Sequence, residues 1–163
     1  MTKTITETKK LIYEIESYGK KYQVTPKLGL YTVYDWEDEE RYGLGICLDL
    51  VEDGEITEPF ATLTVSFGEF LGIKNAAFID TNNCDFANQL LEQGFGTQTQ
   101  YVKQSGFCTY PLWVFEESLL KQIDSKTYEK YEKNSKSIIC CSTGLHVRVL
   151  CTRSAELENR IFS

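Results

Sequence analysis

The sequence predicts a single α+β domain: an antiparallel sheet of five or more strands, with two or three short helices packed on one face. Three observations predict it. Hydrophobic residues recur at every second position through long stretches of the first half, which is the period of a half-buried strand. Tyr and Phe, which favour strands, number ten and nine among 163 residues. Helical spacing with possible capping residues appears only later in the chain. The length suits one domain with a real core.

The first element is a predicted hairpin. Leu11 to Ser17 alternates between apolar and polar residues, Tyr18 to Lys21 supplies the turn, and the alternation resumes from Tyr22 to Leu30. A helix over residues 5–18 is the alternative, but Gly19 and the period of two favour strands. Pro26 predicts an edge position or a bulge, because proline cannot donate to a strand ladder.

An antiparallel meander is predicted next. Its strands cover residues 29–34, 42–51 and 59–67, with a loop over 35–41. Asp53-Gly54 lies between two alternating runs, which is a strong signal for a two-residue hairpin turn. A buried strand is predicted over 76–80, followed by a helix over 84–93 with N-cap candidates in Thr81 to Asn83 and a stop at Gly94. A strand is predicted over 106–115, and its Pro111 predicts an edge position or a bulge. Two helices, over 116–123 and 125–133, complete this part of the chain.

The composition changes at Ser137. All thirteen Lys lie at or before Lys136, whereas three of the four Arg, the single His and three of the six Cys lie after it. Residues 138–141 and 145–151 could form a further hairpin. The predicted organisation is therefore an α+β domain over residues 1–136 and an appended hairpin or tail over residues 137–163.

The six Cys are expected to be free thiols in a cytoplasmic protein. The chain starts MTKTITETKK, without the apolar core of a secretory signal, and no apolar run approaches the roughly 20 residues that span a bilayer. Disulfides are uncommon in a reducing compartment. No membrane association is expected.

Three strings in the centre of the chain resemble one bacterial family. EDGEITEPFATLTVSF, FIDTNNCDFANQLLEQGFG and SGFCTYPLWVF occur in that order and resemble the domain of unknown function 4313, whose members usually read EDGEPFATLTVN, IDTNNCPWAEEFIEENGLGEPTG and SGFCTYPLYRF. The resemblance spans about Leu48 to Tyr131. It implies an origin in phages, plasmids or conjugative elements, and it implies no biochemical activity. The loop over 35–41 and the tail are expected to lie outside the family pattern.

Charge is concentrated in one window. Residues 35–58 hold ten acidic residues and one base, a charge of −9, whereas the whole chain carries −7. In a meander the two acidic turns in this window fall at opposite ends of a strand. A negative field attracts basic surfaces and repels nucleic acid, and Trp is enriched at interface hot spots. The expected partner-binding residues are therefore Asp35, Trp36, Glu37, Asp38, Glu39 and Glu40, although a merely solubilising loop is the simpler interpretation.

Other patterns carry weaker hypotheses. Cys108 could be a nucleophile, but the only His, His146, lies in the tail, so a core thiol is favoured. Cys141, His146 and Cys151 match no usual zinc spacing. A ligand loop is possible at Asp80, Asn82, Asn83, Ser105, Thr109 and Tyr110, with helix capping as the favoured alternative. No catalytic residue, metal, cofactor or direct nucleic-acid binding is predicted.

The sequence therefore predicts a non-enzymatic acidic interaction protein of a mobile element. Its most specific form is an inhibitor of a host defence nuclease, either anti-CRISPR or anti-restriction, whose acidic loop occupies a basic channel for nucleic acid. The alternatives are a small ligand-binding module or Cys-dependent enzyme centred on Cys108, and a structural accessory of conjugation.

Overall fold

The structure is a computed structural model that describes residues 10–139, with side chains described as far as residue 134. Eight strands form two four-stranded sheets, with neighbours in the order β1-β2-β3-β4 and β5-β6-β8-β7, and every paired strand is antiparallel. The mostly antiparallel α+β fold is confirmed. The single sheet is wrong, because the strands divide between two sheets. Within the described residues, no helix is both long and apolar enough to cross a membrane.

The first sheet is a four-strand meander, as predicted for its central part. Its strands are β1 (Tyr13–Ser17), β2 (Lys20–Tyr34), β3 (Glu40–Glu52) and β4 (Glu55–Thr62). Tyr18-Gly19 and Asp53-Gly54 form the two tight turns, and all four residues have positive φ. Such turns match the twist of the flanking strands. Residues 20–34, expected as two segments, form one continuous strand.

Pro26 lies at an edge, which was one of its two predicted positions. β1 pairs with β2 only as far as Val24, so the backbone of Pro26 faces no strand on that side. Its other side pairs with Leu48 of β3. The missing N–H of proline therefore costs no ladder hydrogen bond.

Leu63 carries the chain from one sheet to the other. It separates β4 from β5 (Thr64–Val65), which the sequence predicts as one strand. The Leu63 N–H donates to the Ile46 carbonyl at 3.0 Å, and the Leu63 carbonyl accepts the Asp80 N–H at 2.9 Å. Its side chain is fully buried. Leu63 thus joins the two sheets through backbone and core together, and this is why the chain changes sheets here.

The second sheet contains a strand that sequence analysis missed. β6 (Ala76–Ile79) is buried throughout, as predicted, and pairs with β8 (Cys108–Val114). β7 (Thr97–Ser105) was missed because its Thr and Gln residues lack an apolar alternation. Since β8 lies between β6 and β7, Pro111 is not at an edge; the ladder is instead irregular in β7 opposite it.

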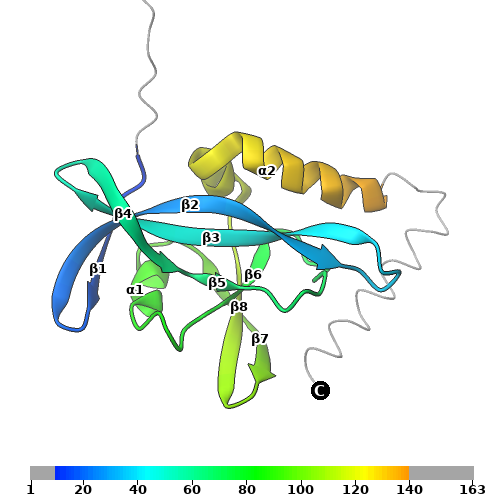
Figure 1. Ribbon diagram of the computed structural model, residues 1–163, viewed down its shortest axis with the longest axis horizontal. Coiled ribbons are helices and arrows are strands. Elements are labelled where there is room, and N and C mark those ends of the chain that lie inside the picture. The colour runs from blue at the N-terminus through cyan, green and yellow to red at the C-terminus, as the bar shows by residue number, and fades with distance from the viewer. Residues whose placement is uncertain (1–9, 140–163) are drawn as a thin grey trace, which may run out of the picture.

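The two helices do not share one face. Figure 1 shows α2 (Glu117–Ile139) on one side of the long strands and α1 (Ala87–Glu92) on the other. α1 starts after Phe86 without a side-chain cap, so the predicted capping by Thr81 to Asn83 is wrong. It does end as predicted: Gly94 has φ 77°, and the next N–H reaches back to the Leu90 carbonyl at 3.0 Å.

α2 combines the two predicted C-terminal helices across a kink. Asp124 has φ −158° and ψ 96°, and its carboxylate accepts the N–H groups of Lys126 and Thr127, both at 3.1 Å. It therefore acts as the N-cap of the second half. The helix continues to Ile139, past the expected boundary at residue 136; the predicted tail hairpin beyond it lies outside the described residues.

One core joins both sheets and both helices. It includes Ile46 of β3, Trp113 of β8, Leu90 of α1 and Tyr128 of α2. α2 is also fixed by Asn75, whose N–H donates to the Tyr131 hydroxyl at 2.9 Å and whose Oδ1 accepts the Tyr128 hydroxyl at 3.0 Å. These buried bonds join α2 to the segment just before β6.

Candidate functional site

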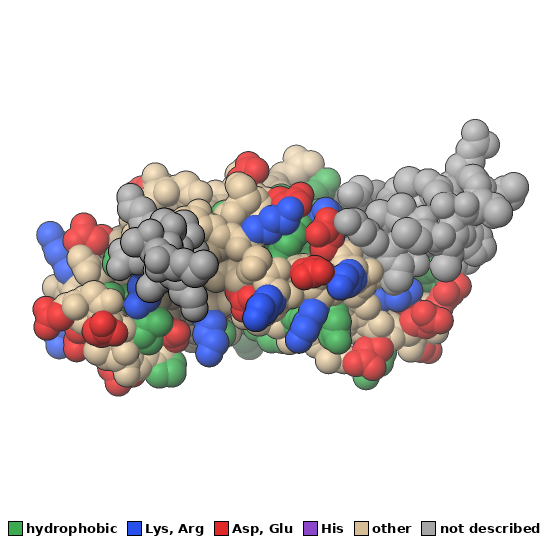
Figure 2. Space-filling model, turned by 90° about the horizontal axis from the view of Figure 1, so that it is seen from above, with side chains coloured by type: hydrophobic (Ala, Val, Ile, Leu, Met, Phe, Trp, Pro, Cys, Tyr) green, Lys and Arg blue, Asp and Glu red, His purple; other side chains and the backbone are tan. Residues whose placement is uncertain are grey.

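The acidic loop, residues 35–40, joins β2 to β3 at one end of the molecule. The second acidic turn, at Asp53-Gly54, lies at the other end of β3, and Figure 1 shows the two turns at opposite ends. Thirteen residues separate them along the strand, which corresponds to roughly 40 Å. Figure 2 shows acidic side chains gathered at the end that bears the loop, with both charge signs mixed over α2. The −9 window is therefore two separate patches, as expected.

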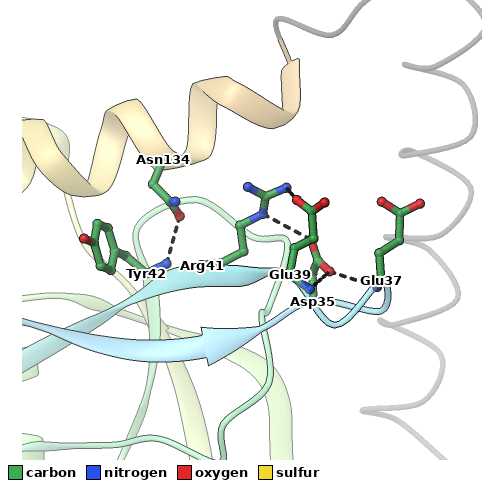
Figure 3. Close-up of polar contacts among 6 residues, drawn as sticks. All are labelled: Asp35, Glu37, Glu39, Arg41, Tyr42 and Asn134. Carbon is green, nitrogen blue, oxygen red and sulfur yellow. Dashed lines mark hydrogen bonds and ion pairs between the residues drawn. The ribbon is translucent and has the colours of Figure 1, made fainter.

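Asp35 fixes the conformation of the loop from inside. Its Oδ1 accepts the N–H of Glu37 at 2.8 Å and of Glu39 at 3.0 Å, and its Oδ2 accepts the Arg41 Nε–H at 3.1 Å (Figure 3). Its side chain is only 5% exposed. The Asp35 carboxylate is thus fully engaged within the loop. Asp35 was expected to contact a partner, but its carboxylate instead supports the backbone that carries the other expected contact residues.

The remaining acidic side chains of the loop face outward. Glu37, Asp38 and Glu40 are exposed, and Glu37 extends away from the Asp35 contacts in Figure 3. Glu39 also meets Arg41, at 3.4 Å, but remains 62% exposed. An exposed ion pair of this kind contributes little to stability. Four carboxylates consequently project from a loop whose backbone is held in place.

Trp36 gives this charged surface an apolar component. It is 43% exposed, and the neighbouring Tyr34 is 53% exposed. A half-exposed aromatic ring beside carboxylates suits a surface that binds the aliphatic stems and cationic heads of Lys or Arg. The arrangement can hold a basic protein surface by charge and by ring contact together.

Two contacts distant in sequence support the base of the loop. The Tyr34 N–H donates to the Gly68 carbonyl, and the Tyr34 carbonyl accepts the Phe70 N–H at 3.0 Å. On the other strand, the Tyr42 N–H donates to Asn134 Oδ1 of α2 at 2.8 Å (Figure 3). Sequence analysis missed Gly68, Phe70 and Asn134, since no local pattern relates them to the loop. They anchor β2 just before the loop and β3 just after it.

The six residues of the predicted ligand loop lie in two segments, residues 80–83 and the β7–β8 hairpin, which one hydrogen bond joins. Asn82 Nδ2 donates to the Thr109 carbonyl at 3.5 Å, while Asp80 accepts from the Asn83 backbone N–H at 3.3 Å and side-chain amide at 2.8 Å. Ser105 lies opposite Cys108 beside the hairpin turn. The Asp80 carboxylate is thus occupied by two hydrogen bonds from Asn83.

The thiols of the described residues show no catalytic arrangement. Burial, followed by the Asp80 and Asp85 carboxylates, raises the pKa of Cys84 to about 11, which suppresses its thiolate. Desolvation, and then the Cys108 thiol and the Asp80 carboxylate, raise the pKa of Tyr110. Tyr110 therefore lies near both Cys108 and the Asp80 carboxylate. His146, Cys141 and Cys151 lie outside the described residues, within which no group of three possible metal ligands occurs.

The comparisons with known proteins identify a family and nothing closer. The family model described as "Domain of unknown function (DUF4313)" matches residues 33–135. The match starts before the acidic loop, so the expectation that this loop lies outside the family pattern is wrong. The curated proteins contain no match to the chain. The solved structures contain none either.

Proposed function

The chain belongs to the DUF4313 family, and from that premise we propose that it is a non-enzymatic binding protein whose acidic loop docks on a basic protein surface. In its most specific form, the protein belongs to a mobile genetic element and inhibits a host defence nuclease of the restriction or CRISPR type. The family resemblance supports the mobile-element setting. The geometry of the loop supports the mode of binding.

The observation that carries this proposal is the internal role of Asp35. Because its carboxylate holds two backbone N–H groups and Arg41, the outward carboxylates are presented on an ordered backbone. A preorganised loop loses less conformational entropy on binding than a mobile one. A loop that served solubility alone would not need this internal support.

The sign of the charge favours a partner that normally binds nucleic acid. Channels for DNA or RNA are lined by Lys and Arg that contact phosphates. Four exposed carboxylates next to Trp36 complement such a lining, and their own field repels the nucleic acid that would compete for it. The proposed inhibition is therefore competitive with nucleic acid and weakens as salt rises.

Two matched triple charge reversals test the proposal. One replaces Glu37, Asp38 and Glu40 with Lys, and the other replaces Glu52, Asp53 and Glu55 with Lys at the far turn. Both change the net charge equally, and each includes one Asp with positive φ. DNA cleavage by a panel of restriction endonucleases and RNA-guided nucleases is measured with each variant and with the original protein, alongside direct binding to each nuclease.

The original protein should bind and inhibit at least one nuclease of the panel. The loop variant should bind about 100-fold more weakly or worse, the far-turn variant should stay within about threefold, and Trp36→Ala should lose about tenfold. Equal losses from both triple variants would exclude the loop as the docking site. A protein that binds no nuclease, and that recovers only partners without a nucleic-acid channel from its native host, would exclude the nuclease form.

The alternative centred on Cys108 is tested on the same protein. Iodoacetamide labelling, followed by mass spectrometry, compares the rate at Cys108 in the folded and the denatured chain. We expect no acceleration, because the charged group that acts on the neighbouring Tyr110 is the Asp80 carboxylate, whereas an activated thiol needs a nearby positive charge. Clearly faster labelling in the folded state would instead favour a thiol-dependent function.

A further inference from the structure

The two sheets have four edge strands, and the edge of β1 is sealed by a helix. Gln93, the C-cap residue of α1, accepts the Glu14 N–H at 3.2 Å and donates to the Glu14 carbonyl at 2.7 Å. Gln89, one turn earlier, does the same to Glu16 at 2.7 and 2.8 Å. Two side-chain amides thus replace a neighbouring strand. The outer backbone groups of β1 at these two residues are satisfied within the chain.

Two further edges carry features that prevent strand pairing. β4 contains Pro59, the acidic Glu55 and Glu58, and two register shifts against β3. β5 is only two residues long. Short strands, proline, edge charges and bulges are the usual protections of exposed edges. Neither β4 nor β5 is therefore a good template for another strand.

β7 has fewer of these protections in its last four residues. It has nine residues with no proline and no acidic residue, and no other described strand pairs with its outer side. Its one charged residue, Lys103, is paired with Glu69 at 2.9 Å. The irregular part of the strand lies between Gln98 and Val102, which leaves Val102 to Ser105 in regular register with β8.

The backbone groups that β7 leaves open follow from the hairpin. Ser105 and Cys108 flank a two-residue turn, so they exchange hydrogen bonds with each other. Because such pairs alternate along an antiparallel ladder, Lys103 also bonds across to β8, whereas the N–H and C=O groups of Val102 and Gln104 point outward. Pro111 of β8 lies opposite Val102. Because Val102 directs its N–H and C=O groups away from β8, the missing N–H of Pro111 costs no hydrogen bond between the two strands.

We propose that this edge binds β7 of a second copy of the chain, antiparallel and centred on Gln104. A register centred on Lys103 would place two Lys side by side, which is unfavourable. Centring on Gln104 sets Lys103 opposite Ser105 of the second copy and leaves no like charges facing each other. The pairing is isologous, so each copy uses the same surface and the assembly closes as a dimer.

The same register accounts for the exposed tip of the hairpin. Phe107 is 109% exposed and Val102 is 42% exposed, and Figure 1 shows the β7–β8 hairpin projecting from the body of the molecule. Pairing about Gln104 carries the exposed Phe107 ring towards Tyr101 of the second copy, a ring that is partly buried against the core of its own chain. One strand and a tip form a small interface, so the dimer is weak.

Sedimentation velocity over a wide concentration series measures the association of the full chain. The original protein should form a reversible dimer. Gln104→Pro, which removes the outward N–H, should weaken dimerisation by at least about tenfold, and Phe107→Ser should weaken it as well. Gln98→Lys, on the same strand but outside the regular segment, is the matched control and should have no effect. Melting temperatures verify that each variant is folded.

A charge swap tests the register itself. Gln104→Lys and Gln104→Glu should each dimerise roughly fivefold more weakly than the original chain, whereas an equal mixture of the two should regain the original strength as a heterodimer. A chain that stays monomeric throughout the concentration series overturns the proposal. A dimer whose dissociation constant does not change when residue 104 is substituted overturns it as well. Slow hydrogen exchange of the Val102 and Gln104 amides in a monomer would overturn it too, by showing another segment on this edge.

Discussion

The two turns at the ends of β3 are both acidic but differ in construction. The far turn is a minimal Asp53-Gly54 hairpin whose shape comes from two positive φ angles. The acidic loop is longer, and its shape comes from the side chain of Asp35, which is almost entirely buried. The far turn needs only its own backbone, whereas the loop has a support that is separate from the groups it displays. Charge alone therefore does not distinguish a binding surface; the supporting contacts do.

Removal of the support should have the largest effect. Asp35→Ala leaves two backbone N–H groups and Arg41 without their shared acceptor, and we expect the free energy of unfolding to fall by about 2–3 kcal/mol. Partner binding should weaken although the outward carboxylates remain. Chemical denaturation measures the first effect and titration calorimetry the second. Asp53→Ala is the control, and a loss of stability as large as that of Asp35→Ala would remove the distinction between the two turns.

The far turn should depend on its glycine. Gly54 has φ +78°, and an added Cβ would meet no atom within 4 Å, so Gly54→Ala introduces backbone strain without a clash. We expect a loss of about 1–2 kcal/mol in unfolding free energy, with no change in partner binding. Thermal and denaturant unfolding measure the loss. A neutral Gly54→Ala would mean that the turn relaxes into another conformation.

A third Asp shows whether the Asp35 arrangement is general. Asp124 also accepts N–H groups from residues that follow it, and the hydroxyl of Thr127 donates to it at 2.6 Å. Asp124→Ala should cost about 1 kcal/mol, the usual value for an N-cap. Asp124→Asn should lose less free energy of unfolding than Asp124→Ala. If both variants are as stable as the original chain, the second half of α2 does not need an N-cap at the kink.

The pH dependence of Asp124 has a definite sign. Hydrogen bonds from the Thr127 side chain and backbone lower its pKa below the ordinary 3.8. Its contribution is therefore complete above the ordinary value and disappears as the pH falls through the lower folded-state value. The stability difference between the original chain and Asp124→Ala should shrink below about pH 4. Denaturation curves over this range measure it, and an unchanged difference would contradict the assignment.

Sequence reasoning succeeded where local sterics decide. Asp53-Gly54, the stop at Gly94 and the interruption at Asp124 each express a preference of a few neighbouring residues. It failed where the partners lie far apart. β7 carries no periodic signal of its own, and its role depends on β8 beside it. The start of α1 was misplaced because Asp80 and Asn83 bond to each other instead of capping the helix.

The sequence by itself determined the concentration of acidic charge between residues 35 and 58, the strand-rich composition and the tight turns. Only the tertiary structure decided that Asp35 supports the loop instead of facing a partner, that the strands divide into two sheets at Leu63, and that Gln89 and Gln93 seal one edge while β7 stays open. The reason is physical. A turn is fixed by the backbone torsions of adjacent residues, whereas burial and edge pairing depend on groups such as Glu14 and Gln93, which are 79 positions apart.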